Sequence, residues 1–393
     1  MIRDWLRDRL ELTRGEANGN VLPMEGLRGF AVFLVFAVHY VTLIEPWMGA
    51  KTPLFSVARA FHAIGNTGVD LFFVLSGYLI YGSLMSKDQS FLPYAYRRIQ
   101  RIYPVFTAVF CAYVILSFAR PGESKIPNES WDALIYLTQN FLLLPGLFPI
   151  EPLITVAWSL SYEMLYYLAL PFLIWFLALR KKSLAWRVAF FLALTLVLVT
   201  TCAVFGGPVR LIMFIAGILL AEVMRHQLIK SPGSVVASAA LLTGLLSALS
   251  PVQGAFGIAL KAACLYVAFF VVCHACFARP LGPLGRTFSL TGLRWLGNMS
   301  YSYYLVHGVS LQSACIVLEK FVPPQDRGTF FFLALMPVMF AWTLIPSAVM
   351  FMLVERPFSL TPKKSAPIDS RGTRNMPPRL IRGIEGGGDG RSD

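Results

Sequence analysis

Long apolar runs constrain this chain more than any other feature of its sequence. An α-helix needs about 20 mostly apolar residues to cross the hydrocarbon core of a bilayer, and a backbone in lipid must satisfy its hydrogen bonds internally. Runs of roughly this length cover residues 27–46, 65–84, 99–119, 158–179, 187–205, 209–226, 233–250, 255–277, 296–319 and 329–353. They predict an all-α, polytopic transmembrane bundle of about ten spans.

The composition excludes a soluble enzyme and a DNA-binding domain. Of the 393 residues, 56% are hydrophobic and only 14% are charged, whereas a soluble globular protein carries roughly 25% charged residues. The net charge of +13 does not indicate nucleic acid, because the basic residues fall in short clusters between apolar runs rather than along one face. Membrane lipid is therefore expected to surround most of the surface.

The basic residues also predict the orientation. With ten spans and a cytoplasmic N-terminus, the inner segments hold 25 Lys and Arg residues and the outer segments hold seven, as the positive-inside rule requires. A shorter run at 133–148 is interrupted by polar residues and by Pro145, and counting it as a span would place Arg180, Lys181 and Lys182 outside. We therefore expect this run to be interfacial or re-entrant and both termini to be cytoplasmic.

The two ends of the chain differ from its apolar middle. Residues 1–22 mix Arg with Asp and Glu and lack the apolar core of a cleaved signal peptide. The end of the chain is rich in Arg, Gly and Pro, a composition typical of disorder. We expect a cytoplasmic N-terminal tail over 1–22, one membrane domain over 23–358 and a disordered, basic cytoplasmic tail over 359–393.

All six cysteines lie in apolar stretches, so no extracellular disulfide framework is expected. Cys273 and Cys276 have the spacing of a metal or redox pair, but no second pair exists and both fall inside a predicted span. Packing of small apolar side chains is the favoured interpretation. No metal and no permanently bound cofactor are expected.

Titratable side chains within spans are costly and mark functional sites by default. Arg28 and His39 share the first span, and their separation of eleven positions corresponds to roughly 16 Å at about 1.5 Å per residue. Because eleven residues are close to three turns, both side chains face the same way. This face combines a cation near the cytoplasmic surface with a titratable base in the interior. A snorkelling arginine and a structurally hydrogen-bonded histidine would give the same pattern.

Other spans carry further polar groups. Glu163 lies one to two turns inside the fourth predicted span, whereas Asp70 begins the second, where the helix dipole alone favours an acid. His307 lies eleven residues into the ninth span, at nearly the depth of the first-span histidine. It recurs with Tyr301 and Tyr304 on one helix face, as a packed aromatic stripe also would.

Arg98 and Arg101 open the third predicted span on its cytoplasmic side. Their i, i+3 spacing points two guanidinium groups the same way, which suits a bidentate grip on phosphate. Anionic lipid headgroups would also explain the pair. Together with the histidines and acids, these arginines predict a phosphate-bearing donor that enters from the cytoplasm and a base near the middle of the membrane.

Several motifs occur in one order along the chain: Arg28 with ten residues to His39, Val69-Asp70-Leu71-Phe72-Phe73-Val74-Leu75-Ser76-Gly77-Tyr78, Arg98-x-x-Arg101 before Tyr103-Pro104, Trp158-Ser159-Leu160 with Glu163, Gly297-x-x-Ser300-Tyr301 with Tyr304-Leu305-x-His307, and Glu355-Arg356-Pro357-Phe358. In this order the chain resembles the integral-membrane acyltransferase family 3, bacterial proteins that O-acylate surface glycans, exopolysaccharides and some antibiotics. The resemblance covers residues 22–358.

The resemblance implies a ten-helix enzyme of the bacterial inner (cytoplasmic) membrane. Such an enzyme moves an acyl group from cytoplasmic acyl-CoA to a hydroxyl of a surface or exported glycan or glycolipid. The resemblance makes acetyl the expected acyl group. The expected site residues are His39, Glu163 and Asp70 for catalysis, Arg28, Arg98 and Arg101 for donor binding, and Ser76, Trp158, Tyr301, Tyr304 and His307 for substrate binding.

The chemistry agrees with this expectation. A sugar hydroxyl is a poor nucleophile and needs a general base with a near-neutral pKa, for which histidine is the natural choice. A carboxylate beside the His39 imidazole would fix its tautomer, with Glu163 as the first candidate and Asp70 as the second.

Two other classes of function remain open at this point. The intramembrane histidine and acids suit a proton-coupled transporter or flippase, and they also suit a scaffold in which buried polar groups only pack helices. A proton relay leaves Arg98 and Arg101 unexplained, and the hydrophobic segments show no inverted repeat. Hydrolysis of labelled acetyl-CoA by the purified protein discriminates between these classes.

Overall fold

The computed structural model describes residues 2–12, 21–49 and 52–360. Within these ranges the chain is almost entirely helical, and its only β feature is an isolated bridge between Pro145 and Phe148. The predicted all-α fold is confirmed. Most of the predicted C-terminal tail, residues 361–393, lies outside the described residues, as do residues 13–20 of the N-terminal tail.

Fifteen α-helices and a final π-helix, η6, follow one another along the described chain. They are α1 (Ile2–Leu10), α2 (Val21–Ile44), α3 (Pro53–Gly65), α4 (Gly68–Ser86), α5 (Phe91–Ala119), α6 (Ser130–Phe141), α7 (Trp158–Phe176), α8 (Leu184–Phe205), α9 (Ile212–His226), α10 (Ser234–Ser247), α11 (Gly254–Ala278), α12 (Pro283–Phe288), α13 (Thr291–Asn298), α14 (Ser300–Phe321), α15 (Gly328–Met350) and η6 (Phe351–Leu360).

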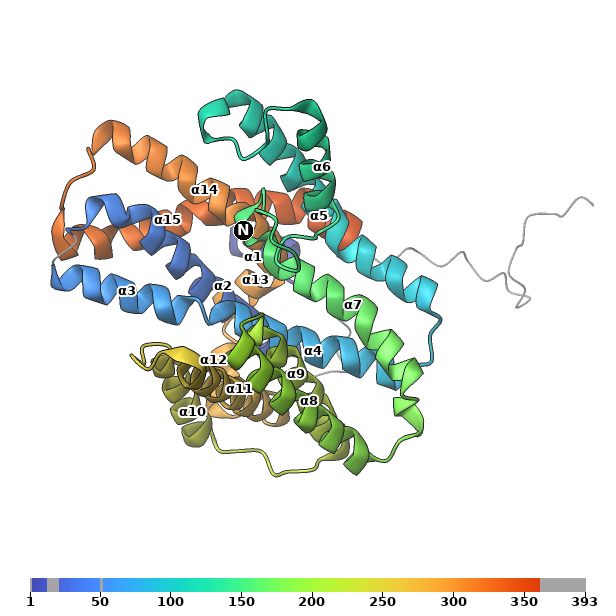
Figure 1. Ribbon diagram of the computed structural model, residues 1–393. Helices are drawn as coiled ribbons and strands as arrows, with labels where there is room; N and C mark the ends of the chain where they lie inside the picture. Colours follow the sequence, from blue (N-terminus) through green and yellow to red (C-terminus); the bar gives the residue numbers. More distant parts are fainter. Residues whose placement is uncertain (1, 13–20, 50–51, 361–393) are drawn as a thin grey trace, which may run out of the picture.

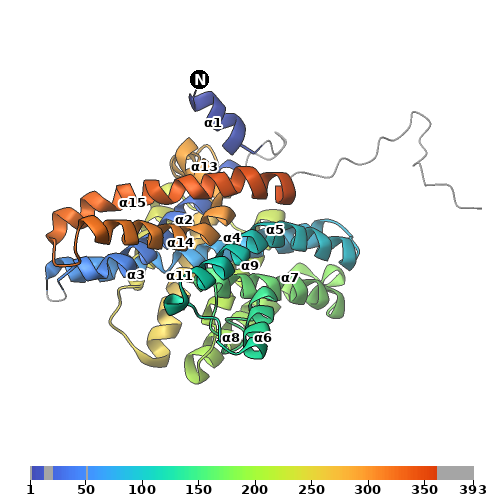
Figure 2. The same cartoon turned by 90° about the horizontal axis from the view of Figure 1, so that it is seen from above.

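Helix α4 lies between two groups of helices (Figure 1). Helices α8, α9, α10 and α11 lie on one side of it, whereas α2, α14 and α15 lie on the other. Helices α14 and α15 run side by side in both views (Figures 1 and 2), and α3 leads almost directly into α4.

Six helical segments of the described chain are long and apolar enough to cross a membrane. They are Leu22–Trp47, Pro53–Ser86, Phe91–Ala119, Leu184–Phe205, Gly254–Ala278 and Gly328–Leu360. Each coincides with a run predicted from the sequence. The other four predicted runs form α7, α9, α10 and α14, of which α9 and α10 have only 15 and 14 residues. The chain is thus a multi-pass helical protein, and the count of ten spans stays a prediction.

The predicted interfacial run forms α6, whose 12 residues are too few to cross the hydrocarbon. Asn140 near its end folds the next segment back. Its side-chain amide donates to the carbonyls of Tyr136 (3.0 Å) and Glu151 (3.3 Å), and its side-chain oxygen accepts from the Leu153 amide at 2.7 Å. These bonds hold the loop that leads into α7.

Glycines allow two helix pairs to pack backbone against backbone, as small residues do in membrane bundles. A Cβ at Gly77 of α4 would overlap the Phe214 carbonyl of α9, and a Cβ at Gly217 of α9 would overlap the Val74 carbonyl of α4. On α2, a Cβ at Gly29 would likewise overlap a carbonyl of α13. These contacts fix α2 and α4, the helices that carry several of the predicted site residues.

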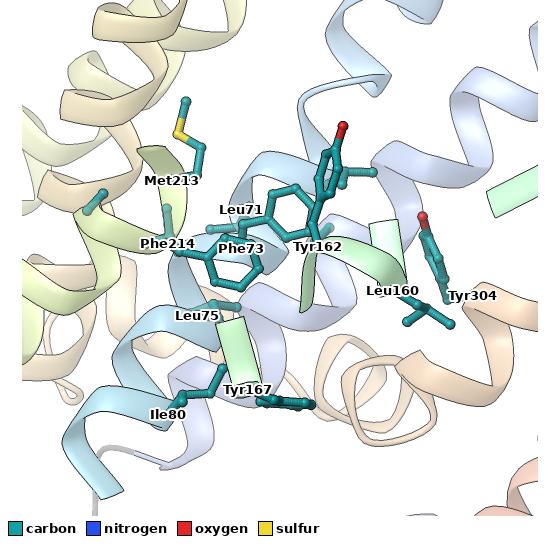
Figure 3. Close-up of a cluster of buried hydrophobic side chains, with 14 of the residues drawn as sticks. Leu71, Phe73, Leu75, Ile80, Leu160, Tyr162, Tyr167, Met213, Phe214 and Tyr304 are labelled. Atoms are coloured by element: carbon teal, nitrogen blue, oxygen red, sulfur yellow. The ribbon is translucent and has the colours of Figure 1, made fainter. Parts of the chain in front are cut away.

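Aromatic stacking joins α4 to α7 and α9. The Phe73 ring lies between those of Phe214 and Tyr162 (Figure 3), with centroid separations of 4.5 Å and 6.1 Å respectively. Leu71 and Leu75 are buried in the same cluster. The apolar face of α4 is thereby buried, and Ser76 is left to face a polar cavity between the helices.

Candidate active site

Two histidines from distant parts of the chain meet inside the bundle. His39 of α2 is half-buried and His307 of α14 is fully buried. Nδ1 of His39 lies 3.3 Å from Nε2 of His307, and the ring planes are nearly perpendicular, with centroids 4.7 Å apart. The similar depth predicted for the two residues agrees with this direct contact.

Backbone carbonyls determine the tautomer of each ring. Nδ1 of His307 lies 3.0 Å from the Tyr303 carbonyl, and Nδ1 of His39 lies 2.9 Å from the Val35 carbonyl. A carbonyl can only accept, so in each ring Nδ1 carries the proton. Nε2 of neutral His307 is then an acceptor for the His39 Nδ1–H. The remaining nitrogen of His39, Nε2, keeps its lone pair and can act as a base.

The structure differs from the expectation that a carboxylate orients His39. Glu163 accepts hydrogen bonds from Tyr167 (2.5 Å) and Ser76 (3.4 Å). Among the described residues, the hydrogen-bond partners of the His39 ring are Val35 and His307. A second imidazole therefore takes the position expected for an acid, because α14 rather than α7 packs against this part of α2.

A polar cavity collects many of the predicted residues. It has a volume of about 60 Å³ and lies between α2, α4, α5, α7 and α14. Six predicted site residues line it: Arg28, Ser76, Arg101, Glu163, Tyr301 and Tyr304. Catalytic, donor-binding and substrate-binding candidates from five helices thus share one narrow space.

Arg101 forms an ion pair with an acidic residue that was not among the predicted site residues. Its Nη1 lies 2.6 Å from Oε1 of Glu355, which is completely buried. The second oxygen of Glu355 accepts from the backbone amide and hydroxyl of Ser302 at 3.0 Å and 2.6 Å. The Arg101 guanidinium also lies over the Tyr301 ring, 5.3 Å from its centroid. Arg101 therefore joins α5, η6 and α14 as well as lining the cavity.

Arg98 has different surroundings. Its guanidinium lies between the rings of Tyr94 and Tyr167, at 5.1 Å and 5.0 Å from their centroids. This geometry is a double cation–π contact. Its Nε has no hydrogen-bond partner among the described residues. The two arginines predicted to act as a matched pair are thus held in different ways.

A larger cavity adjoins the histidine pair. This His39 cavity has a volume of about 630 Å³ and is lined by residues that include His39, Thr42, Tyr113, Arg120, Val156 and Gln312. Tyr304 separates it from the polar cavity: its hydroxyl lies 2.7 Å from the Ser159 hydroxyl and donates to the Val156 carbonyl at 3.1 Å. The two cavities therefore meet at a tyrosine whose hydroxyl is held by the first turn of α7 and by the residues just before it.

Asp70 and Trp158 lie away from the histidine pair. Asp70 is buried, and its Oδ1 is 3.8 Å from Nε of Arg210. Arg210 also lies over the Trp158 ring, 5.6 Å from its centroid. Asp70 thus belongs to an ion pair between α4 and the segment before α9. A contact between Asp70 and His39 was the second expectation, and the structure does not show one.

Sequence reasoning missed several members of this site. Tyr167 lies four residues after Glu163, so helical spacing could have paired the two. Glu355 was visible only as part of a terminal motif, and Arg210 only as one basic residue of an outer segment. Their partners lie far along the chain, and no local pattern reports such contacts.

Within the described ranges, no three His, Cys, Asp or Glu side chains gather closely enough to hold a metal ion. Cys273 and Cys276 are free and fully buried in α11, where they pack in the apolar core. Their packing agrees with the interpretation preferred from the sequence.

The structure is a multi-pass helical bundle in which two imidazole rings meet at the wall of a large cavity. The model of acyltransferase family 3, described as an acyltransferase domain, matches residues 23–352. The chain belongs to this family, as its motifs predicted.

Two relatives show the breadth of the similarity. The acyltransferase MdmB of Streptomyces mycarofaciens is 29% identical over 313 residues, which cover 72% of this chain and 77% of that protein. The peptidoglycan O-acetyltransferase OatA of Listeria monocytogenes is 28% identical over 375 residues, or 86% of this chain but only 55% of its own length. No solved structure matches the chain.

Proposed function

We propose that this protein is an O-acyltransferase that moves an acetyl group from cytoplasmic acyl-CoA to a hydroxyl of a surface or exported glycan. The observation that carries the proposal is the His39–His307 pair, which leaves Nε2 of His39 basic at the wall of a large cavity. Family membership supports the reaction class. The glycan acceptor is supported by the name of OatA, a peptidoglycan O-acetyltransferase.

The proposed reaction uses His39 as the general base. The acceptor hydroxyl oxygen attacks the thioester carbonyl carbon and gives its proton to Nε2 of His39. The new C–O ester bond forms, the C–S bond breaks, and the imidazolium returns the proton to the departing CoA thiolate. His307 holds the Nδ1 side of the ring, so that the basic nitrogen faces the reactants. The same nitrogen is also suited to carry the acyl group transiently.

The donor is proposed to reach His39 through the polar cavity. This cavity is narrow, at about 60 Å³, which suits the thin pantetheine arm of CoA. Arg28 and Arg101 line it, and Arg98 lies next to it over the Tyr167 ring. We propose that these arginines attract the phosphate-bearing donor, with Arg98 the most available because Arg101 is paired with Glu355.

The acceptor is proposed to enter the His39 cavity from the opposite side of the membrane. Its lining includes the polar side chains of Arg120, Glu123, Lys125 and Gln312, which suit hydroxyl-rich sugars. This arrangement accompanies the proposed topology of ten spans, two cytoplasmic termini and a bacterial inner-membrane location. The excess of basic residues in the predicted inner segments supports it.

Replacement of Arg98 tests donor binding. Arg98→Glu should weaken CoA binding sharply, whereas Arg98→Lys should retain part of the affinity, because Lys keeps the charge but not the planar guanidinium. Arg97→Glu is the matched control: it is adjacent, exposed and bonded to Gln89, and it changes the charge equally. Equal CoA affinity in the Arg98→Glu and Arg97→Glu proteins would refute the assignment.

The acceptor requires an experiment in cells. Mass spectrometry of surface polysaccharide from cells with and without the gene should show O-acetyl groups that depend on this protein. Restoring the gene should restore them, and a His39→Ala version should not. Unchanged acetylation across these strains would contradict a glycan acceptor.

A further inference from the structure

A third cavity lies near the ends of α4 and α7 and the beginning of α5. It has a volume of about 670 Å³ and combines aromatic and apolar walls with charged side chains. These helix ends lie on the same side of the molecule in Figures 1 and 2. We call it the Trp175 cavity; it is lined by Leu84, Asp88, Gln89, Phe91, Tyr94, Leu168, Pro171, Phe172, Ile174, Trp175, Ala178, Arg180 and Lys181.

The Trp175 cavity continues the line of the other two. The same three helices wall both it and the polar cavity: α4 (Leu84 and Ser76), α5 (Tyr94 and Arg101) and α7. On α7 the consecutive residues Tyr167 and Leu168 divide the two spaces. Arg98 bridges them, because it lies over Tyr94 on one side and Tyr167 on the other.

The sizes of the cavities distinguish what each can hold. The polar cavity, at about 60 Å³, has no room for a purine nucleotide, whereas the Trp175 cavity, at about 670 Å³, does. From Trp175 to Ser159 on α7, sixteen residues at 1.5 Å each span roughly 24 Å. A ligand that fits this sequence of spaces has a bulky head and a long, thin arm.

The side chains of the Trp175 cavity suit a nucleotide that bears phosphates. Aromatic faces of Trp175, Phe172 and Tyr94 are surfaces on which bases stack. Lys181 forms no ion pair among the described residues, so its charge is available for phosphate. Arg180 is less available, since it pairs with Asp88 and donates to the Leu84 and Lys87 carbonyls at 2.8 Å and 3.0 Å.

We propose that the Trp175 cavity binds the nucleotide head of the acyl-CoA donor, with its base on the aromatic wall and its phosphates near Lys181 and Arg98. This inference rests on the proposed function, which requires an acyl-CoA donor. It adds where the head binds and which residues select it. It also assigns Arg98 to the junction of head and arm, where the pyrophosphate lies.

Two pairs of adjacent residues provide matched variants. Lys181→Glu should weaken CoA binding about tenfold or more through lost charge pairing, whereas Lys182→Glu should not, because Lys182 lies over the Trp186 ring outside the cavity. Trp175→Ala should weaken it similarly through lost stacking, whereas Phe176→Ala should not. Trp175 and Phe176 are 74% and 66% exposed, so neither change should disturb the fold. Trp175→Phe keeps an aromatic face and should retain most of the affinity.

The measurement is CoA affinity by calorimetry on purified full-length protein in nanodiscs, alongside competition by adenosine 3′,5′-bisphosphate. The bisphosphate should displace CoA from wild type and do so poorly from the Trp175→Ala protein. If the Lys181→Glu and Trp175→Ala proteins bind CoA as tightly as their Lys182→Glu and Phe176→Ala controls, the nucleotide site is overturned and the proposed function stays intact. Wild type that neither binds nor consumes acetyl-CoA would refute the proposed function itself.

Lipid composition provides the last arm of the test. Nanodiscs of neutral and of anionic phospholipid should give the same difference between Lys181→Glu and its control. A difference that appears only in anionic nanodiscs, without displacement by the bisphosphate, would assign the cavity to a lipid headgroup and overturn the nucleotide assignment.

Discussion

Replacing His307 by Phe separates orientation from proton transfer. Phe keeps a flat ring, which can stack on Tyr303 as the imidazole does with a centroid separation of 5.4 Å, but it removes both nitrogens. His39 still donates from Nδ1 to the Val35 carbonyl at 2.9 Å. His39 therefore loses one hydrogen bond, about 0.5–1.5 kcal/mol, which corresponds to about 2–12-fold in kcat at about 1.4 kcal/mol per decade. The other bond that is lost, from Nδ1 of His307 to the Tyr303 carbonyl, does not involve His39.

His39→Ala should have a much larger effect. Removing a general base typically costs about 10²–10⁴-fold in rate. Acetyl transfer and CoA affinity should be measured in parallel for wild type, His39→Ala and His307→Phe, and CoA affinity should stay unchanged in all three. If His307→Phe loses as much activity as His39→Ala, or if His39→Ala keeps more than about one-tenth, His307 is the base and the assigned roles are wrong. Full activity in both variants would refute a catalytic role for the pair.

Three further predictions concern stability and topology. Arg101→Ala leaves the buried Glu355 without a counter-ion. The change should lower the free energy of unfolding, measured by denaturation in detergent, by about 3–5 kcal/mol. An unchanged free energy of unfolding would contradict a structural ion pair. Gly77→Ala should destabilise the protein, because the added Cβ overlaps the backbone of α9. Gly82→Ala is the control on the same helix, since a Cβ there meets nothing within 4 Å. Equal stability of the two variants would refute the backbone contact. An impermeant thiol reagent should label Ser130→Cys and not Ser183→Cys in intact cells, both positions being exposed; the reverse pattern would invert the proposed orientation.

The sequence predicted the helical membrane fold because its evidence is local. A run of apolar residues indicates a lipid or core environment whichever helices pack against it, and this is why the predicted spans 27–46, 99–119 and 255–277 coincide with most of α2, α5 and α11. Six of the fourteen residues that line the polar cavity were among the predicted site residues, since Arg28, Glu163 and Tyr301 are costly to place in lipid unless they line a shared polar space.

The pairings within the site were not predictable in the same way. The contact between His39 and His307 joins positions 268 residues apart, and that of Arg101 with Glu355 joins positions 254 apart. Glu163, deep inside its predicted span, was the first candidate for the partner of His39, but its carboxylate accepts hydrogen bonds from Tyr167 and Ser76 instead. Such choices depend on how helices pack and on which backbone carbonyls are close.

We propose that His39 performs acyl transfer from CoA within the membrane domain. This proposal is tested most directly by reconstituting the full chain in proteoliposomes with acetyl-CoA labelled on the acetyl group. Wild type should release labelled acetate or transfer the label to an added sugar acceptor. The His39→Ala protein should bind acetyl-CoA with unchanged affinity and leave the thioester intact. Equal consumption of labelled acetyl-CoA by wild type and His39→Ala would contradict the account.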